Sequence, residues 1–170
     1  MATGKLDESA LLAQLADERG ILRTMYEYCH SLDYSQGDRY ADCFEPDGVF
    51  EKRLQGTVSE GRHQGRQVLR SRIESTWAAA AAQGPNKPFE KHVILAPIIT
   101  VRGKEATAEA YWALLSSEPK DSGPSVRAFG RYKDRWAKGT DGKWRIKERI
   151  AEVEARSGGR LPQAMKALGA

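Results

Sequence analysis

The sequence predicts a single α+β domain in which helices come first and an antiparallel β-sheet follows. The 170 residues are enough for one substantial core but too few for two comfortable domains. Apolar residues recur at helical spacing in the first third of the chain, and the second half reads as strand after strand, separated by turn sequences. Helices grouped before strands, rather than alternating with them, are typical of the α+β class.

The first third is predicted to form two helices. Asp7 is a candidate N-cap for a helix that runs to about Leu15, and Asp17 is a candidate cap for a second helix that ends at residue 33 or 34. Gly20 lies inside the second helix and leaves the boundary between the two open. At about 100° per residue, the apolar side chains of the second helix form one stripe. The stripe contains Leu22, Met25, Tyr26, Cys29 and Leu32.

Short elements and a long helix are predicted next. Residues 39–44 have the pattern of one or two helical turns, residues 46–48 are a turn signal, and a first strand begins at residues 49–51. Glycines at 56, 61 and 65 indicate a loop that leads into a helix over residues 66–82. The side chains of this helix that are expected to face inward are Val68, Leu69, Ile73, Trp77 and Ala80 or Ala81.

The second half is predicted to form four long strands of a curved sheet. They are Phe89–Val101, Ala106–Ser116, Val126–Lys138 and Lys143–Val153. Turn sequences join them at residues 102–104, 119–124 and 140–143. In the last strand, apolar residues at 144, 146 and 150 alternate with basic residues at 145, 147 and 149, which predicts one buried and one solvated face.

The bulk composition is that of an ordinary globular protein. The net charge of +4 invites a nucleic-acid partner, but basic and acidic residues are interleaved, and the basic stretch 131–138 alternates as one face of a strand would. Cys29 and Cys43 form no CxxC pattern and are expected to be reduced core thiols. The sequence shows neither a signal peptide nor a membrane span. We therefore expect a cytoplasmic protein that binds neither nucleic acid nor membranes.

Sequence motifs for metals and nucleotides are incomplete. The spacing of Glu27 and His30 fits half of a di-iron carboxylate site, but the chain has no second such pair, and its three histidines are too dispersed for a zinc triad. The segment Gly61–Gly65 lacks the Gly-Lys-Ser/Thr ending of a phosphate loop, and neither GxGxxG nor GxSxG occurs. The sequence therefore predicts no metal, no cofactor and no serine nucleophile.

Asp33 carries the main functional signal, because it is a carboxylate on the apolar stripe of its helix. An unpartnered carboxylate there would be costly. The best candidate partner is His92, which opens the most apolar run of the chain, residues 92–99. If Asp33 accepts a hydrogen bond from one ring nitrogen, the other becomes an oriented base for a substrate proton. The alternative is a buried Asp–His hydrogen bond that only stabilises the fold.

The order of these segments resembles the SnoaL-like branch of the nuclear transport factor 2-like superfamily over residues 16–153. The matching segments are Ile21–Asp33, Ala41–Phe50, Gly61–Gly65, Lys91-His92, Gly130–Asp134 and Asp141–Ile146. The resemblance implies a cone-shaped, curved antiparallel sheet packed around three helices, with a ligand pocket inside the cone. It also implies a helical extension over residues 1–15, the domain over 16–155 and a tail over 156–170.

The resemblance also implies a site. In scytalone dehydratase, hexachlorocyclohexane dehydrochlorinase and bile-acid 7α-dehydratase, an Asp at the end of the long helix faces a His that opens a strand. Asp33 and His92 match these positions, and Tyr28 matches a tyrosine in the site of the bile-acid enzyme. Those dehydratases carry another His or Asp on the next strand, where this chain reads Ala110–Leu115.

Three further residues are candidates for substrate binding. Trp112 is the best candidate for the pocket wall because it lies on the strand after His92, and Phe50 is a core residue that could also line the pocket. Arg131 could point into the cone and bind a phenolate, carboxylate or ketone oxygen, although its neighbours suggest a solvated face. His63 is expected at the surface.

These residues predict a cofactor-independent lyase with His92 as general base, Asp33 as its orienting partner and Tyr28 as a hydrogen-bond donor. The substrate would be a small, mostly apolar, oxygenated cyclic or aromatic molecule, and the reaction dehydration or retro-aldol-type C–C cleavage. An isomerase or cyclase of the same fold, and a non-catalytic ligand binder or dioxygenase-β-like accessory subunit, are the alternatives. A homodimer or homotrimer is expected from the resemblance.

Overall fold

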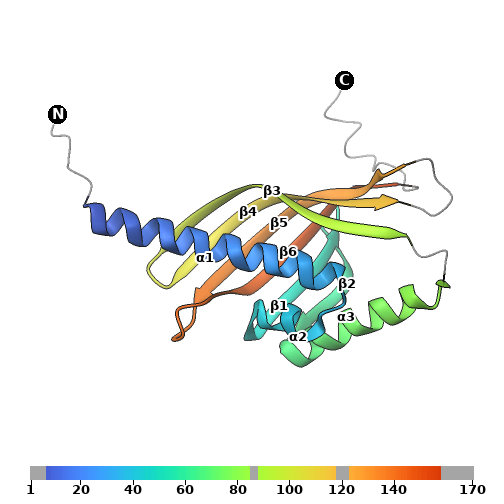
Figure 1. Cartoon of the computed structure of the whole chain (residues 1–170), viewed down its shortest axis with the longest axis horizontal. Helices are drawn as coiled ribbons and strands as arrows, with labels where there is room; N and C mark the ends of the chain where they lie inside the picture. Colours follow the sequence, from blue (N-terminus) through green and yellow to red (C-terminus); the bar gives the residue numbers. More distant parts are fainter. Residues whose placement is uncertain (1–6, 85–87, 118–122, 158–170) are drawn as a thin grey trace, which may run out of the picture.

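A computed structural model describes residues 7–84, 88–117 and 123–157 of the chain. Within them, three helices accompany one curved six-stranded sheet, so the predicted α+β class is confirmed (Figure 1). The helices are α1 (Glu8–Asp33), α2 (Gly37–Asp42) and α3 (Arg66–Ala81). The strands are β1 (Phe44–Leu54), β2 (Thr57–Gln64), β3 (Phe89–Arg102), β4 (Glu105–Ser117), β5 (Ser125–Lys138) and β6 (Trp144–Arg156). Most of the predicted tail and of the turn at 119–124 lies outside the described residues.

The sheet is mixed rather than wholly antiparallel. Its strand order is β2-β1-β6-β5-β4-β3, and β1 runs parallel to β6 while the other neighbouring pairs are antiparallel. The expectation of an antiparallel sheet is wrong for this one pair. The first and last strands are neighbours in space but far apart in the chain, so no local sequence pattern could show their relative direction.

Helix α1 is continuous, so the predicted break between two helices is wrong. Asp7 caps it as expected, since its Oδ1 accepts a hydrogen bond from the Ser9 backbone at 3.1 Å. Asp17 does not cap a helix but accepts from the indole of Trp144 at 2.9 Å. A Cβ on Gly20 would lie 2.9 Å from Cδ1 of that indole, so this glycine permits close packing of α1 on β6.

The buried stripe of α1 is rotated from the predicted one. Met25 and Cys29 are buried as expected, but Tyr26 is 47% exposed. The other buried positions on this helix are Ile21, Thr24, Tyr28 and Ser31. Leu22 and Leu32 are only partly buried against the core. Tertiary contacts, rather than apolar residue type, therefore set the face that α1 presents to the sheet.

The predicted loop over residues 56–65 is instead strand β2. It pairs with β1 through a tight hairpin in which Gln55 and Gly56 both have positive φ angles, 54° and 79°. The turn signal at residues 46–48 lies inside β1, at an irregularity between Phe44 and Val49. Strand β2 is an edge strand with polar, mostly exposed side chains, so its sequence carries little strand signal.

Helix α3 has the predicted extent, and it anchors one wall of the site. Leu69 and Ile73 are fully buried as expected, whereas Val68 is exposed. The Trp77 indole donates to the backbone carbonyl of Leu32 at 2.8 Å and so ties α3 to the last turn of α1.

A β-bulge in β6 overturns the predicted alternation of its faces. Trp136 pairs with Ile146 and Arg135 pairs with Glu148, so Lys147 is an extra residue on this strand. Trp144 and Ile146 face the core as predicted, but beyond the bulge Arg149 is fully buried. Side chains on a regular strand alternate between its two faces. One extra residue therefore places every later side chain of β6 on the face opposite to the one that regular alternation predicts.

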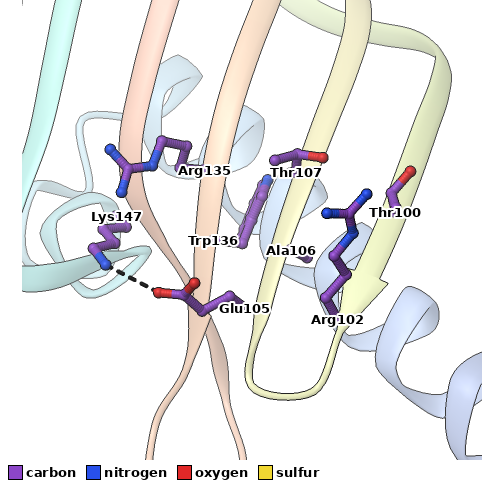
Figure 2. Close-up of a pocket in the computed structure, with 8 residues that line it drawn as sticks. All are labelled: Thr100, Arg102, Glu105, Ala106, Thr107, Arg135, Trp136 and Lys147. Atoms are coloured by element: carbon purple, nitrogen blue, oxygen red, sulfur yellow. Dashed lines mark hydrogen bonds and ion pairs between the residues drawn. The ribbon is translucent and has the colours of Figure 1, made fainter.

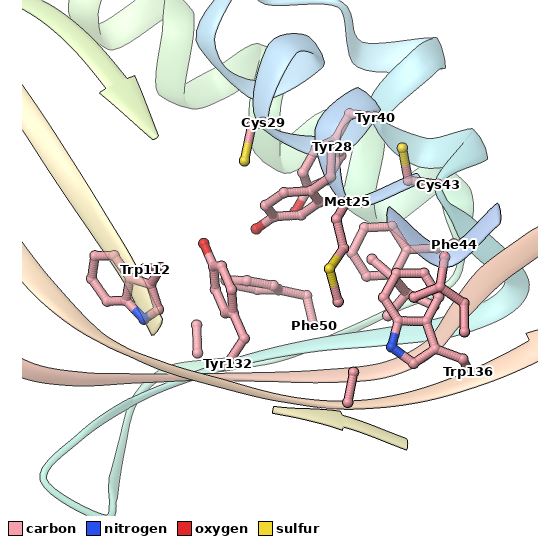
Figure 3. Packing of buried hydrophobic residues seen from close by; sticks show 14 of the residues in the cluster. Met25, Tyr28, Cys29, Tyr40, Cys43, Phe44, Phe50, Trp112, Tyr132 and Trp136 are labelled. Carbon is pink, nitrogen blue, oxygen red and sulfur yellow. The ribbon is translucent and has the colours of Figure 1, made fainter. Parts of the chain in front are cut away.

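Aromatic residues fill the core between the helices and the sheet (Figure 3). Tyr28 packs between Tyr40, Phe44 and Tyr132, with ring centroids 5.1–6.1 Å apart. Cys29 and Cys43 are free, buried thiols, as predicted. Burial raises the pKa of each thiol to about 12, so both stay protonated. None of the helices in the described residues is both long and apolar enough to cross a membrane.

Candidate active site

A hollow of about 960 Å³ lies between the sheet, the end of α1 and α3. All six strands contribute to its wall. Its apolar side chains are Leu32, Phe50, Leu54, Trp112, Leu114, Ala128, Ala151 and Val153. Polar side chains that also line it include Lys52, Glu60, His63, Arg72, His92 and Tyr132. Apolar side chains combined with polar groups that converge on one cavity are the usual form of a small-molecule site.

Asp33 and His92 are in direct contact, as the sequence predicts. Asp33 is the last residue of α1, and its Oδ1 lies 2.7 Å from Nδ1 of His92 in β3. The backbone N–H of His92 also donates to both carboxylate oxygens at 3.1 Å. The Asp33 side chain is only 5% exposed, whereas that of His92 is 23% exposed and lines the hollow.

This arrangement fixes the chemistry of the imidazole. An ionised carboxylate can only accept hydrogen bonds, so Nδ1 must carry the proton and Nε2 of a neutral ring is left as an acceptor. Nε2 has no hydrogen-bond partner among the described residues. His92 therefore presents an oriented base to the hollow, and Asp33 can stabilise the imidazolium that forms when this base takes a proton.

Tyr132, not Tyr28, is the tyrosine that lines the hollow. Tyr28 is buried behind the wall, whereas the Tyr132 ring stacks on Trp112 with centroids 5.8 Å apart. Figure 3 shows the two tyrosine hydroxyls pointing toward one another. Burial raises the pKa of Tyr132 well above its ordinary value, so this hydroxyl remains a hydrogen-bond donor. The predicted direct role of Tyr28 is therefore corrected to a contact with Tyr132.

Trp112 and Phe50 line the hollow as predicted, but Arg131 does not. The Trp112 indole donates to the Glu152 carbonyl at 3.1 Å, which holds its ring in place. Arg131 lies on the outer face of the sheet, 43% exposed, with its Nε 2.5 Å from Glu154. The same alternation in residues 131–138 that suggested a solvated face for Arg131 places Tyr132 on the inner face.

Four polar residues of the hollow were not identified from the sequence. Glu60 accepts from Lys52 at 2.7 Å and from Arg72 at 2.9 Å. Burial opposes the ionisation of Glu60, but these two hydrogen bonds outweigh it and hold its pKa at about 2. His63 lines the hollow, so its expected surface position is wrong, and burial together with the charge of Arg72 lowers its pKa. Since β2 was predicted as a loop, no sequence signal placed His63 or Glu60 on the wall.

Arg149 supports the site from behind. Its guanidinium is fully buried, donates to both oxygens of Asp134 at 2.9 and 2.7 Å, and lies about 4 Å from the ring centres of Tyr28 and Tyr132. Burial by itself would lower the pKa of Arg149, but the Asp134 carboxylate holds it well above its ordinary value. A permanent cation therefore fixes the two tyrosine rings.

A smaller depression of about 260 Å³ lies on the sheet near the β3–β4 turn (Figure 2). Its charges are partly paired, since Lys147 donates to Glu105 at 3.1 Å. It contains neither a histidine nor a buried carboxylate, so it is not a candidate for proton transfer. Among the described residues, no group of three or more His, Cys, Asp or Glu side chains is placed to hold a metal ion.

A family model described as the SnoaL-like domain matches residues 13–150. The chain belongs to the SnoaL-like domain family. The predicted resemblance is thus confirmed, and the site of this SnoaL-like protein lies inside the fold that the family shares. A comparison with curated proteins gave no match.

Solved structures agree with the SnoaL-like fold. An NTF2-like protein with a cystatin-like fold from Novosphingobium aromaticivorans is 19% identical, with a TM-score of 0.73 over 99% of each chain. A candidate scytalone dehydratase from the same organism is 19% identical, with a TM-score of 0.66 over 88% of this chain and 91% of that one. The β subunit of a candidate aromatic-ring-hydroxylating dioxygenase, also from this organism, is 21% identical, with a TM-score of 0.66 over 85% and 92%. At these identities the similarity shows the fold alone.

Proposed function

We propose that this SnoaL-like protein is a cofactor-independent lyase that acts on a small oxygenated cyclic or aromatic molecule. The observation that carries the proposal is the 2.7 Å contact between Asp33 and His92 on the wall of a hollow that apolar and polar side chains line together. A histidine oriented by a buried carboxylate is suited to general base catalysis near neutral pH. The structural similarity to a candidate scytalone dehydratase is consistent with this reaction class.

In the proposed reaction, Nε2 of His92 removes a proton from the carbon beside a substrate carbonyl. The electron pair of the C–H bond moves toward the carbonyl oxygen and forms an enolate, which the Tyr132 hydroxyl can stabilise by donating a hydrogen bond. In a dehydration, the enolate then expels a β-hydroxyl, which leaves as water after it receives the proton from His92. In a retro-aldol cleavage, Nε2 of His92 instead takes the β-hydroxyl proton, and the β-carbon becomes a carbonyl as the Cα–Cβ bond breaks. The electron pair of that bond forms the enolate, which then takes the proton back from His92 at its α-carbon.

Isomerisation is the nearest alternative, because the same enolate could be protonated at another carbon. An accessory subunit without activity is the more distant alternative. Such a subunit would be expected to have a cone filled by its own side chains, whereas the hollow here is open to about 960 Å³ and reaches His92. The open hollow favours an enzyme.

Exchange of α-protons tests the proposed base without knowledge of the natural substrate. The probe is 2-tetralone, an aromatic cyclic ketone, incubated with the protein in D₂O and followed by NMR. We expect the wild-type protein to accelerate deuterium incorporation, His92→Ala to lower the rate by about 10²–10⁴-fold, and Asp33→Asn to lower it substantially.

His30→Ala is the matched control, since this exposed histidine lies three residues before Asp33 but is not among those that line the hollow. Its exchange rate should equal that of the wild-type protein. Circular dichroism should confirm that all variants are folded. Wild-type exchange rates in both His92→Ala and Asp33→Asn would refute the proposed base.

A further inference from the structure

The hollow contains a second polar cluster, formed by Arg72, Lys52, Glu60 and His63, that the proposed proton transfer does not use. Arg72 reaches the cluster from α3, Lys52 comes from β1, and Glu60 and His63 come from β2. Two cations share one carboxylate, because one oxygen of Glu60 accepts from Lys52 and the other from Arg72. The group formed by these three charged side chains therefore retains one net positive charge.

The side chains along the whole hollow also carry more positive than negative charge. The charged side chains along the hollow are Lys52, Arg72, Arg127 and Arg156 against Glu60 and Glu90. A cavity lined mostly by one sign of charge concentrates ligands of the opposite sign. The charge of the wall thus favours an anionic ligand over a neutral one.

Arg72 is the cation best placed to bind such a ligand. Its side chain is only 18% exposed, and its guanidinium lies 4.3 Å from the centre of the Phe50 ring, which restricts its orientation. Nη2 donates to Glu60, while Nε and Nη1 have no hydrogen-bond partner among the described residues. A rigid guanidinium with unused N–H groups matches the geometry of a carboxylate or phenolate oxygen.

We propose that the substrate of this hollow carries an anionic oxygen, a carboxylate or an ionised phenol, and that Arg72 binds it. The inference rests on the proposed function only in assigning the substrate to this hollow. The neighbouring His63 supports it, because burial and the charge of Arg72 keep its pKa low and its ring neutral, so it adds a polar contact without a second charge. The competing explanation is that Arg72 only ties α3 to the β1–β2 hairpin.

Binding of a matched pair of aromatic ligands separates the two explanations. The probes are 2-naphthoate and 2-naphthamide, which differ in charge but have nearly the same shape, and binding is measured by isothermal titration calorimetry. We expect the wild-type protein to bind naphthoate about tenfold or more tightly than naphthamide, and Arg72→Gln to lose most of this preference. Arg72→Lys should keep part of it.

Glu60→Gln gives a second test that does not depend on the stability of the Arg72 variants. Removing the carboxylate frees both cations, so the preference for naphthoate should rise, whereas a purely structural role of Arg72 predicts no gain. Arg131→Gln on the outer face is the control for a general loss of positive charge and should leave the preference unchanged. His92→Ala should also keep the preference, which separates this test from that of the proposed base.

Three results would overturn the inference. The first is equal binding of the two probes to the wild-type protein. The second is an unchanged preference in a folded Arg72→Gln variant together with no gain in Glu60→Gln. The third is the failure of both probes to bind at millimolar concentration.

Discussion

Asp33 occupies a position that is unfavourable for a carboxylate in two ways. It is nearly buried, and it lies at the C-terminal end of α1, where the helix dipole disfavours negative charge. Two N–H groups of His92, one from the ring and one from the backbone, donate hydrogen bonds to the Asp33 carboxylate and so offset its burial and the effect of the helix dipole. The same residue that orients the imidazole thereby also joins α1 to β3, so the site is built into the contact between the helix and the sheet.

Arg149 should be important for stability even though it is not in the hollow. We expect Arg149→Met to lower the free energy of unfolding by about 3–5 kcal/mol, because Asp134 would be left as a buried charge without its partner. Urea denaturation measures the change. The double variant Asp134→Leu/Arg149→Met should recover much of the loss, and a single variant as stable as the wild-type protein would contradict the prediction.

Glu60 should make stability depend on pH in the acid range. Its pKa is about 2 in the folded protein against an ordinary value of 4.5, so its contribution is complete above about pH 4.5 and is lost as the pH falls toward 2. The contribution is modest, since this side chain is 38% exposed. Urea denaturation at about pH 6 and about pH 3 should show the difference between wild type and Glu60→Gln shrinking with acid. A constant difference would contradict this.

At the scale of elements, the sequence predicts well wherever apolar residues follow a regular period. The four long strands and α3 are within a few residues of their predicted limits, because each has a sustained pattern and a turn or glycine at its ends. The prediction fails for β2, whose polar residues face solvent along a sheet edge, and for β6 after Lys147, where one extra residue reverses the two faces. Both failures depend on how a strand pairs with its neighbour in the sheet, which its own residue pattern does not show.

The residues of the candidate site also divide into those that a local sequence pattern reveals and those that it does not. Asp33 and His92 could be identified because each contrasts with an apolar surrounding, and the alternation along β5 could also have found Tyr132. Arg72 could not be identified, because a basic residue in a helix is usually solvated. Only the β1–β2 hairpin, which packs beside α3, makes Arg72 part of the wall of the hollow. Arg149 could not be identified as a buried residue, because the bulge places it on the face opposite to the one that its spacing from Trp144 and Ile146 predicts.

The contact between α1 and β6 gives a test at the element scale. Alanine normally stabilises the interior of a helix by about 1 kcal/mol relative to glycine. We expect Gly20→Ala instead to destabilise the protein by about 1 kcal/mol, because the new Cβ would press on an indole that is held by Asp17. Thermal and urea denaturation measure the change. Gly61→Ala, where the added Cβ meets no atom within 4 Å, is the control and should be nearly neutral.

At the scale of the whole molecule, the outer face of the sheet exposes large apolar side chains. They are Leu95, Ile98, Tyr111 and Phe129, with Ile98 as much as 73% exposed. On the same face, Glu109 of β4 pairs in register with Lys133 of β5. A two-fold axis between these strands would set Glu109 of one copy near Lys133 of the other. We therefore propose that a second copy of the chain covers this face.

Light scattering coupled to size-exclusion chromatography tests the proposed dimer. We expect a dimer for the wild-type protein and a monomer for Ile98→Glu, because a buried, unpaired carboxylate would oppose association. Leu12→Glu, at an exposed position on the first turns of α1, should leave the dimer intact. A monomeric wild-type protein, a trimer, or an Ile98→Glu variant that remains dimeric would each contradict this arrangement.

The extra residue in β6 has a consequence for the descent of the protein. The pairs on both sides of the bulge already have the faces of a regular strand, because Ile146 faces inward, Glu148 pairs with the outward-facing Arg135, and Arg149 faces inward. Deletion of the codon for Lys147 would therefore straighten the strand and leave Ala151 and Val153 facing the hollow. The bulge thus lets this strand gain or lose one residue at this point while the hollow keeps its wall.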